Sequence, residues 1–456
     1  MRSLKVDERA LEEEREIYAH PRFGAQLIPI AELIGALRAA RTAEDFYRLH
    51  RVLFGRFLGV QAFIREAGRE KRTARQRVAE LSAERPLPCE SLRRLNLRIG
   101  ELDGDLRCAR AVISLYRTIG DAIVWVILGC RRELIAPLGE GERVGWLAEG
   151  RGLEAEFEEI EWLWTERNVF TLHADLTNCV RHGDLLEVTS FTPRQVRLTE
   201  VKAGRAPDPN SKQMQRLARL SQLVNEGSYP GGPSGEPLIL RRCPVAHRTH
   251  QAVLEEALVA ASAETYVARV PEQGLLIEVY DSSDPAELGQ AGAEARSEPA
   301  RQAALGPDED AALVYSTTHR RIRDRHQTFS SQLPLALLPL RIDLLCELLL
   351  GRFDVVVSLD PAVLERRIAE AGLGAEIARG EEAGDRFMRL HSERAQITVP
   401  APTREQVLIE LTTLDCLTET LAWFIADAES GGFDRPAVAL GNLDERSTWM
   451  AGFALP

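Results

Sequence analysis

The sequence lacks the short motifs that carry several common enzyme chemistries. It contains no Walker A loop, no GxGxxG fingerprint, no HExxH helix and no GxSxG elbow. Such motifs cradle nucleotide phosphates, hold dinucleotides, bind zinc and present a serine nucleophile, respectively. ATP-driven motor work, dinucleotide chemistry and esterase chemistry therefore have no support in this chain.

Cysteine is scarce and scattered. The seven cysteines form no CxxC pair, which predicts a reduced, cytoplasmic protein without a disulfide framework. Cys243 lies near His247 and His250 in the stretch CPVAHRTH. A zinc site needs a fourth ligand or an open position. No nearby Cys or His completes this group, so we expect a polar helix start here instead.

Long uninterrupted apolar runs are also missing. The stretch DAIVWVILGC is too short to span a bilayer, and LPLALLPLRIDLLCELLLG contains Arg341, Asp343 and Glu347. Both predict core helices rather than membrane spans. The charged first residues, MRSLKVDERALEEEREIYAH, have no apolar signal-peptide region. We therefore expect a cytoplasmic protein with no membrane partner.

Positive charge is in deficit, because the formal net charge of the 456-residue chain is -12. This argues against a protein that coats nucleic acid or an anionic membrane, although a local basic cleft remains compatible with it. The composition, 45% hydrophobic and 28% charged, is that of a globular protein. The length allows two to four domains.

The element order predicts an α+β multidomain protein. Residues 1–148 form a helical domain in which the breaks at Pro86 and Pro88 predict a hairpin of two long antiparallel helices. Their mixed charges are typical of a solvated face, although a surface that faces nucleic acid or pairs two copies in a homodimer stays open. Residues 149–247 predict a helix, three strands, a helix and a last strand in PLILRRC. Residues 248–456 predict an α/β C-terminal domain in which TYVARV and GLLIEVYD form a hairpin. Residues 282–310, rich in Ala, Gly, Pro and Glu, predict a flexible insertion.

The stretch RHGDLLEVTSFTPRQVRLTEVKAG, residues 181–204, carries ionisable groups on two predicted strands. Side chains alternate along a strand, so Glu200 and Lys202 share one face. If the strands pair as a hairpin, Asp184 lies near Glu200 at the end of the sheet. Two close carboxylates repel one another unless a cation lies between them. Mg²⁺, which prefers hard oxygen ligands, suits such a pair.

These residues resemble the PD-(D/E)xK nuclease superfamily, which has the restriction-endonuclease-like fold. The resemblance is carried by Gly183–Asp184, by Glu200 and Lys202 spaced as E-x-K, and by the helix that begins near Gln213. It covers residues 149–247 and implies an α/β/α core with a small mixed sheet. The match is incomplete, because Leu217 stands where the RecB-like branch has a tyrosine.

The resemblance also implies roles for individual residues. Asp184, Glu200 and the Val201 carbonyl would hold Mg²⁺ or Mn²⁺, and Lys202 would serve catalysis. An acidic residue of the preceding helix often completes such a site. The helix GLEAEFEEIEW offers Glu156, four residues after Gly152 in a G-L-x-x-E pattern. The implied activity is phosphodiester hydrolysis, with DNA the favoured substrate, in defence or repair.

Local charge supports a nucleic-acid partner. Residues 181–219 contain eight Lys or Arg and four Asp or Glu, so this segment is net positive and attracts a phosphate backbone. The predicted nucleic-acid-binding residues are Arg205, Gln213, Arg216 and Arg219. His173 and His182 flank the predicted sheet. Either could assist the metal site, but hydrogen-bonded structural histidines are the favoured expectation.

Two alternatives remain open from the sequence. Glu200 and Lys202 also fit an ordinary solvated hairpin, in which their ion pair contributes little to stability. The whole segment would also fit a catalytically silent relative of these nucleases that binds nucleic acid or protein as an adaptor. Asp121, in GDAIVW, is expected near a helix start, where its negative charge would interact favourably with the helix dipole.

Overall fold

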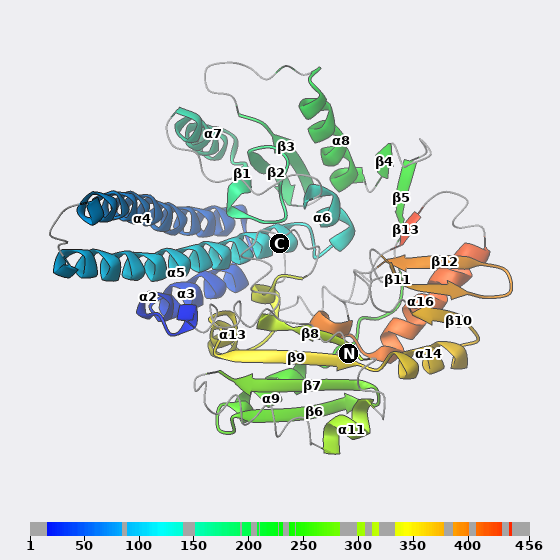
Figure 1. Ribbon diagram of the computed structural model, residues 1–456. Helices are drawn as coiled ribbons and strands as arrows, with labels where there is room; N and C mark the ends of the chain where they lie inside the picture. The colour runs from blue at the N-terminus through cyan, green and yellow to red at the C-terminus, as the bar shows by residue number, and fades with distance from the viewer. Residues whose placement is uncertain are drawn as a thin grey trace.

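The computed structural model describes most of the chain. The described residues are 16–83, 89–139, 151–191, 194–201, 208, 210–226, 228–230, 237–241, 243–282, 299–305, 312–318, 333–377, 386–400, 407–430 and 437–439. They form a mixed α+β protein in which a long helical hairpin projects from a body that contains four small sheets (Figure 1). None of the helices among these residues combines the length and the hydrophobicity that a membrane span requires.

The N-terminal region is helical, as predicted. Its helices are α2 (Pro21–Gly24), α3 (Leu27–Ala39), α4 (Ala43–Ala83), α5 (Cys89–Ile127) and α6 (Arg132–Gly139). Helices α4 and α5 pack side by side as the expected hairpin (Figure 1), and residues 84–88, which contain the two prolines, lie outside the described residues. The first predicted helix is interrupted before α4, where the Asp45 carboxylate accepts hydrogen bonds from the backbone N–H groups of Arg41 and Thr42. Satisfying these N–H groups stabilises the start of a separate helix.

The central region has a three-stranded antiparallel sheet. Its elements are α7 (Arg151–Arg167), β1 (Phe170–His173), η1 (Ala174–Leu176), β2 (Leu185–Phe191), β3 (Arg194–Thr199) and α8 (Lys212–Glu226). The strand order is β1-β2-β3, and both pairs are antiparallel. Helix α8 packs against β3. Apolar residues on β1, β2 and β3 are buried in the main core, which holds this sheet against α4 and α7.

The prediction of one small mixed sheet in this region is wrong about which strands pair. The strand predicted in PLILRRC forms as β5 (Pro237–Arg241), but β5 joins β4 (Ser228–Pro230) and β13 (Ala437–Ala439) instead of the central sheet. It is antiparallel to β4 and parallel to β13. Composition predicts that a segment is extended, whereas the partner depends on tertiary packing. The nearly two hundred residues that separate β5 from β13 hide this pairing from local patterns.

The C-terminal region has two further antiparallel sheets. One has the order β6-β7-β9-β8, and the other the order β10-β11-β12. The elements are α9 (Gln251–Ala261), β6 (Tyr266–Glu272), β7 (Leu275–Asp281), α11 (Pro299–Leu305), β8 (Leu313–Ser316), η3 (Leu335–Leu337), α13 (Ile342–Leu349), β9 (Phe353–Leu359), α14 (Pro361–Glu370), β10 (Gly374–Ile377), β11 (Arg386–His391), β12 (Gln396–Pro400) and α16 (Leu414–Glu429). The hairpin predicted for residues 265–281 forms as β6 and β7.

Part of the predicted flexible insertion is ordered. Pro299–Leu305 forms α11, which packs on β6 and β7 and buries Ala304 and Leu305 against Leu276. The Arg301 guanidinium bonds the fully buried Glu278 carboxylate at 2.9 Å. This ion pair and the small apolar face explain why a segment poor in bulky residues still folds here. Residues 283–298 and 306–310 of the predicted insertion lie outside the described residues.

Candidate active site

Asp184 and Glu200 lie at the same end of the β2–β3 pair. Asp184 immediately precedes β2 and Glu200 immediately follows β3, and the strands pair Leu185 with Thr199. The backbone N–H of Asp184 donates to the Thr199 carbonyl at 2.8 Å, which fixes the two acidic residues side by side at the sheet end. The predicted convergence of these two side chains is therefore present in the fold.

Gly183 makes this close approach possible. Its φ of +77° lies in the left-handed region, and a Cβ there would be 2.8 Å from the Thr199 carbonyl oxygen. A side chain would be strained in conformation and would also clash with the neighbouring strand. The glycine in the Gly183–Asp184 pair thus brings Asp184 against β3.

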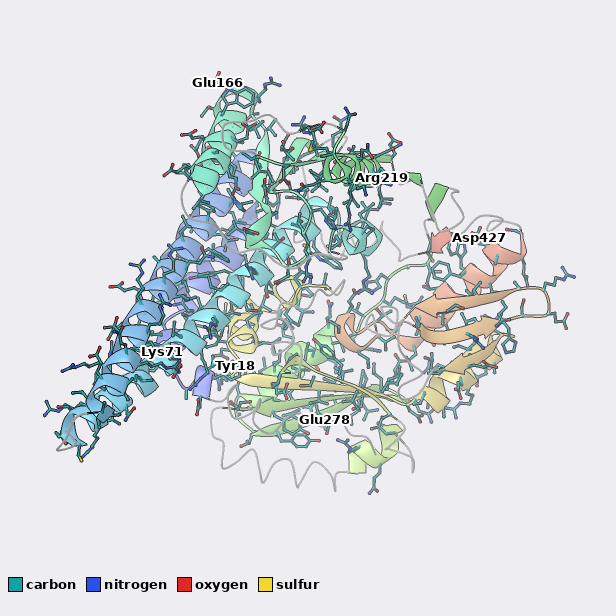
Figure 2. All side chains as sticks on the ribbon, turned by 45° about the horizontal axis from the view of Figure 1, so that its top comes forward. Tyr18, Lys71, Glu166, Arg219, Glu278 and Asp427 are labelled. Atoms are coloured by element: carbon teal, nitrogen blue, oxygen red, sulfur yellow. The ribbon has the colours of Figure 1, made fainter. Side chains whose placement is uncertain are left out.

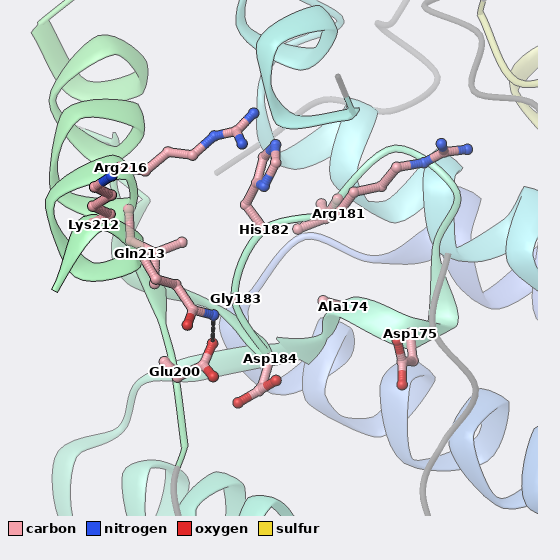
Figure 3. Close-up of a pocket in the computed structure, with 12 residues that line it drawn as sticks. Ala174, Asp175, Arg181, His182, Gly183, Asp184, Glu200, Lys212, Gln213 and Arg216 are labelled. Atoms are coloured by element: carbon pink, nitrogen blue, oxygen red, sulfur yellow. Dashed lines mark hydrogen bonds between the residues drawn. The ribbon is translucent and has the colours of Figure 1, made fainter. Parts of the chain in front are cut away.

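Both carboxylates line a cavity of about 540 Å³ (Figure 3). Asp175 lines the same cavity. Basic residues line it too: Arg181, His182, Lys212 and Arg216. In Figure 3 the His182 and Arg216 side chains lie across the cavity from the Asp184 carboxylate. The cavity therefore has acidic and basic parts within one space, which suits a ligand that carries a phosphate and a bound cation.

Burial raises the pKa of the Asp184 carboxyl to about 6, and the nearby charges of Glu200 and Glu156 act in the same direction. A hydrogen bond of 2.7 Å from the Val201 backbone N–H to Asp184 Oδ2 opposes this shift. An acid whose ionised form is disfavoured by its neighbours gains from an added cation. This is the electrostatic condition that the sequence predicted for the pair.

Glu200 is buried and has a neutral polar partner. Gln213 Nε2 donates to Glu200 Oε2 at 2.5 Å (Figure 3). Gln213 is the second residue of α8, so this contact ties the start of α8 to the end of β3. The nucleic-acid contact predicted for Gln213 stays a prediction; in this structure Gln213 lines the cavity and its amide orients the Glu200 carboxylate.

Glu156 approaches the pair from α7 and is held by His173. The His173 Nε2 atom lies 2.6 Å from Glu156 Oε2. His173 Nδ1 accepts a hydrogen bond of 3.2 Å from the Asp175 backbone N–H, so in the neutral ring the proton is on Nε2 and is donated to Glu156. His173 is therefore hydrogen-bonded, as predicted for a structural histidine, and its partner is the acidic residue chosen from the α7 sequence.

The remaining predicted residues fall into three groups. Arg216 lines the cavity. Arg219, which was predicted to contact nucleic acid, lies further along α8 on the outer surface (Figure 2) and outside the cavity lining. Lys202 and Arg205 lie outside the described residues. The sequence did not single out Asp175. Arg181 and Lys212 were counted only in the net positive charge of residues 181–219, and His182 was expected to be a structural residue, yet all four line the cavity.

Helix α5 supports the loop that leads to the site. The Asp121 carboxylate accepts hydrogen bonds from the backbone N–H groups of Asn178 at 2.6 Å and Cys179 at 2.9 Å. Arg117 Nε donates to the Asp175 carbonyl at 3.2 Å. The predicted placement of Asp121 near a helix start is wrong, because Asp121 lies within α5. Its carboxylate bonds a distant loop, which local sequence does not show.

A metal ion fits part of this donor set. Asp184 and Glu200 supply hard carboxylate oxygens from one cavity, and Mg²⁺ binds through one or two carboxylates while it keeps several waters. Across the described ranges, no group of three or more His, Cys, Asp or Glu side chains is arranged to hold a metal ion. The observed arrangement is thus a two-carboxylate site with Glu156 nearby.

Comparisons with protein-family models, with curated proteins and with solved structures return no match for this chain.

Proposed function

We propose that the protein is a metal-dependent nuclease that hydrolyses phosphodiester bonds, with DNA the favoured substrate. The observation that carries the proposal is the pairing of Asp184 and Glu200 at one strand end, inside a cavity that also contains basic side chains. The raised pKa of Asp184 adds support, because perturbed acids in a cavity are typical of functional sites.

Each group has a role in the proposed reaction. Asp184 and Glu200 would hold Mg²⁺ or Mn²⁺, with the Val201 carbonyl and Glu156 as further candidate ligands. The bound ion would supply polarisation of the phosphodiester and a lowered pKa for water. Gln213 and the Val201 N–H keep the two carboxylates in place. Arg216 and Lys212 would neutralise the phosphate, and Lys202 would orient the attacking water.

The test is cleavage of supercoiled plasmid, single-stranded DNA and RNA with Mg²⁺, with Mn²⁺ and with EDTA. We expect metal-dependent cleavage by the wild type, and losses of at least about 100-fold in Asp184→Asn and Lys202→Ala. Glu226→Gln, an exposed change at the end of α8, is the matched control and should retain full activity. Equal activity in the wild type and both site variants would refute the mechanism.

The adaptor alternative has one observation in its favour. Glu200 and Asp184 already accept hydrogen bonds from Gln213 and Val201, so each carboxylate has a protein partner without any metal. Isothermal calorimetry with Mn²⁺ separates the two functions. Absence of both metal binding and cleavage of every substrate, together with retention of labelled DNA in a filter assay, would favour a catalytically silent binding protein.

A further inference from the structure

The outer half of the helical hairpin is a narrow arm, made of residues 64–83 of α4 and 89–110 of α5. It projects from the body of the protein (Figures 1 and 2). In this half of α4 the buried residues are Ala67, Ala74 and Leu81, which are spaced by seven. Such spacing gives one apolar seam, which packs against α5. Most of the other residues of α4 in the arm are exposed, so the arm is mainly a charged surface.

The arm is net positive, although the whole chain has a formal net charge of -12. Its residues include eleven Lys or Arg and seven Asp or Glu. Three of the arginines take up four of the acidic residues, in the pairs Arg77–Glu80, Arg94–Glu90, Arg98–Glu70 and Arg98–Glu101. The surplus of positive charge therefore belongs to the other bases of the arm.

A second set of bases lies around Asp103 of α5. We call this set the basic face, and its members are Lys71, Arg72, Arg75, Arg107 and Arg110. The Lys71 ammonium pairs with Asp103, and the Arg75 guanidinium lies 4.0 Å from the same carboxylate. Burial lowers the pKa of Lys71, and nearby positive charges lower it further. These charges come from Arg75, Arg110 and Arg107, so bases from two helices are close enough to repel one another.

The acidic residues near the basic face do not balance it. Asp103 serves Lys71 and Arg75, and Glu16 pairs with Arg107 at 2.6 Å. Arg72 and Arg110 are exposed and have no carboxylate partner among the described residues. Arg72 is three residues from Arg75, and Arg110 three from Arg107, so each lies next to a further base on its own helix. Such a concentration of positive charge attracts a polyanion.

The composition of the arm favours a double-stranded nucleic acid as this polyanion. Residues 64–83 and 89–110 contain no Phe, Tyr or Trp, whereas surfaces that bind single strands stack bases on aromatic side chains. Helices that bind membranes combine basic residues with an apolar face. In the arm, Leu97 is the one large apolar side chain that is exposed. A duplex backbone needs neither feature, because it offers about one negative charge per 1.7 Å of its axis.

The basic face lies on the helix that supports the candidate active site. Arg117 of α5 donates to the carbonyl of Asp175, a residue of the active-site cavity. Along the helix axis, Arg117 is about 10 Å from Arg110 and about 21 Å from Asp103. A duplex advances about 3.4 Å per base pair, so these distances correspond to about three to six base pairs. The separation along α5 is thus shorter than one turn of a duplex.

We propose that the basic face of the arm binds the phosphate backbone of a double-stranded nucleic acid. Contacts with phosphates position a duplex without reading its sequence, so this binding is expected to be independent of sequence. The proposal does not require nuclease activity, because a catalytically silent adaptor would use the same face. Duplex DNA and duplex RNA offer the same phosphate oxygens, and the experiment below distinguishes them.

The test measures binding of the full chain to labelled nucleic acids by fluorescence anisotropy, in EDTA so that no metal-dependent cleavage occurs. The probes are duplex DNA, duplex RNA and single-stranded DNA, each longer than the arm and each titrated at several salt concentrations. Binding of a duplex that weakens steeply with salt supports the proposal, and the tighter duplex is the preferred partner. Tighter binding of the single strand, or no binding of either duplex, overturns it.

A triple variant locates the binding surface. Arg72→Gln, Arg75→Gln and Arg110→Gln together remove three exposed charges from the basic face. Each lost phosphate contact reduces the slope of log K against log salt by about 0.9. We therefore expect a slope that is smaller by about 2–3 and an affinity that is at least about tenfold weaker at low salt.

The matched control is a second triple variant, Arg77→Gln with Arg94→Gln and Arg98→Gln. It removes the same net charge from exposed arginines of the same arm, but from those that already pair with glutamates. It should keep the slope and bind within about threefold of the wild type, because salt screens exposed charges that do not touch the duplex. Unchanged duplex affinity in the first variant, or an equal loss in both, overturns the proposal.

Two further readouts separate this proposal from its rivals. Light scattering follows the oligomeric state, and a dimer that dissociates in the first variant, with duplex affinity unchanged, would assign the face to a second copy and overturn the proposal. Plasmid cleavage with Mg²⁺ is measured on the same proteins. A wild type that cleaves nothing but loses duplex binding in the first variant would refute the nuclease function alone and support the arm.

Discussion

Three ionisable residues connect the helical hairpin to the candidate active site. The fully buried His50 on α4 accepts, through Nε2, a hydrogen bond of 3.4 Å from the backbone N–H of His173. The His173 ring in turn bonds the Glu156 carboxylate. Burial lowers the pKa of His50 to about 3, and its electrostatic interactions with His173 and Arg51 act in the same direction. The chain of contacts thus starts at a neutral imidazole and ends at an acidic residue beside Asp184.

The neutral state of His50 should make stability depend on pH. The folded pKa is below the unfolded value of about 6.5, so protons favour the unfolded chain. The contribution of neutral His50 to the free energy of unfolding is fully present above pH 6.5. It is lost as the pH falls from 6.5 toward 3, by up to about 1.4 kcal/mol per pH unit. In His50→Gln, urea unfolding between pH 6.5 and 5 should show a shallower loss than in the wild type. An unchanged slope would mean that His50 is not held neutral.

His173 should affect metal binding more than folding. Its Nε2 proton fixes one oxygen of Glu156, and loss of such an outer partner typically costs 10–100-fold in metal affinity. We expect His173→Gln to weaken Mn²⁺ binding by about tenfold in calorimetry, with cleavage reduced in parallel. The exposed His391→Gln should leave both unchanged. Equal Mn²⁺ affinity in His173→Gln and wild type would show that this histidine only packs.

At the scale of single residues, strand alternation and residue spacing were enough to predict some of the site residues but not their partners. Asp184 and Glu200 were found because two charges interrupt apolar strands, and the hairpin register places them together. The contact of Gln213 with Glu200 was missed, because it depends on how α8 returns across β3. The Glu156–His173 bond also joins separate elements, so each residue was predicted without its partner.

At the scale of elements, α5 supports the site through one helix face that lies very close to the loop containing Leu176. A Cβ at Gly120 would be 2.0 Å from the Leu176 carbonyl oxygen. Arg117 and Asp121, on either side of Gly120, bond the same loop. The helix and the loop therefore meet backbone to backbone, and the absence of a side chain at Gly120 is what permits it.

Gly120→Ala should separate the helix from this loop. The clash is with backbone and cannot be relieved by a rotamer change, so we expect a loss of about 1–3 kcal/mol in the free energy of unfolding, together with reduced cleavage. Gly104→Ala is the matched control on α5, since no described atom lies within 4 Å of its Cβ position. It should gain up to about 1 kcal/mol from helix propensity. Similar stability changes in the two variants would contradict the close contact.

Helices and strands were predictable where the local sequence marks them by periodicity, alternation, proline or glycine. The hairpin of α4 and α5 follows from helical periodicity and two prolines, and the β6–β7 hairpin from alternation around Gly274. The partner of β5 was not predictable, because β13 follows nearly two hundred residues later. Helix α11 was missed because its burial depends on the Arg301–Glu278 ion pair rather than on bulky apolar residues.

At the scale of the whole molecule, the three predicted regions share one interior. A single cluster of buried apolar residues includes Leu37 from α3, Leu186 from β2 and Leu421 from α16. Arg38 on α3 also donates to the Leu338 carbonyl at 2.9 Å, across three hundred residues of sequence. Changes in composition mark the predicted boundaries, but they do not indicate how far neighbouring regions share a core.

A buried ion pair joins the helical and C-terminal regions within this interior. Arg132 Nη2 at the start of α6 bonds Glu410 Oε1 at 2.7 Å, and both side chains are almost fully buried. His247 lies 3.9 Å from the other carboxylate oxygen of Glu410. Helix α6 also receives the Arg181 backbone N–H at the Leu138 carbonyl, 2.9 Å away. Helix α6 therefore connects the ion pair to Arg181, a residue that lines the candidate active site.

The two charges should depend strongly on one another. Removing one partner leaves the other buried without its closest counter-charge, which costs about 3–5 kcal/mol, whereas replacing both with apolar residues costs much less. We expect Arg132→Met and Glu410→Leu each to destabilise the protein by that amount in urea unfolding, with the double variant at least about 2 kcal/mol more stable than additivity predicts. The exposed Arg341–Asp343 pair, treated by the same cycle, should show coupling below about 1 kcal/mol. A similarly small coupling at Arg132 and Glu410 would mean that this contact does not hold the two regions together, and their common core would then depend on apolar packing alone.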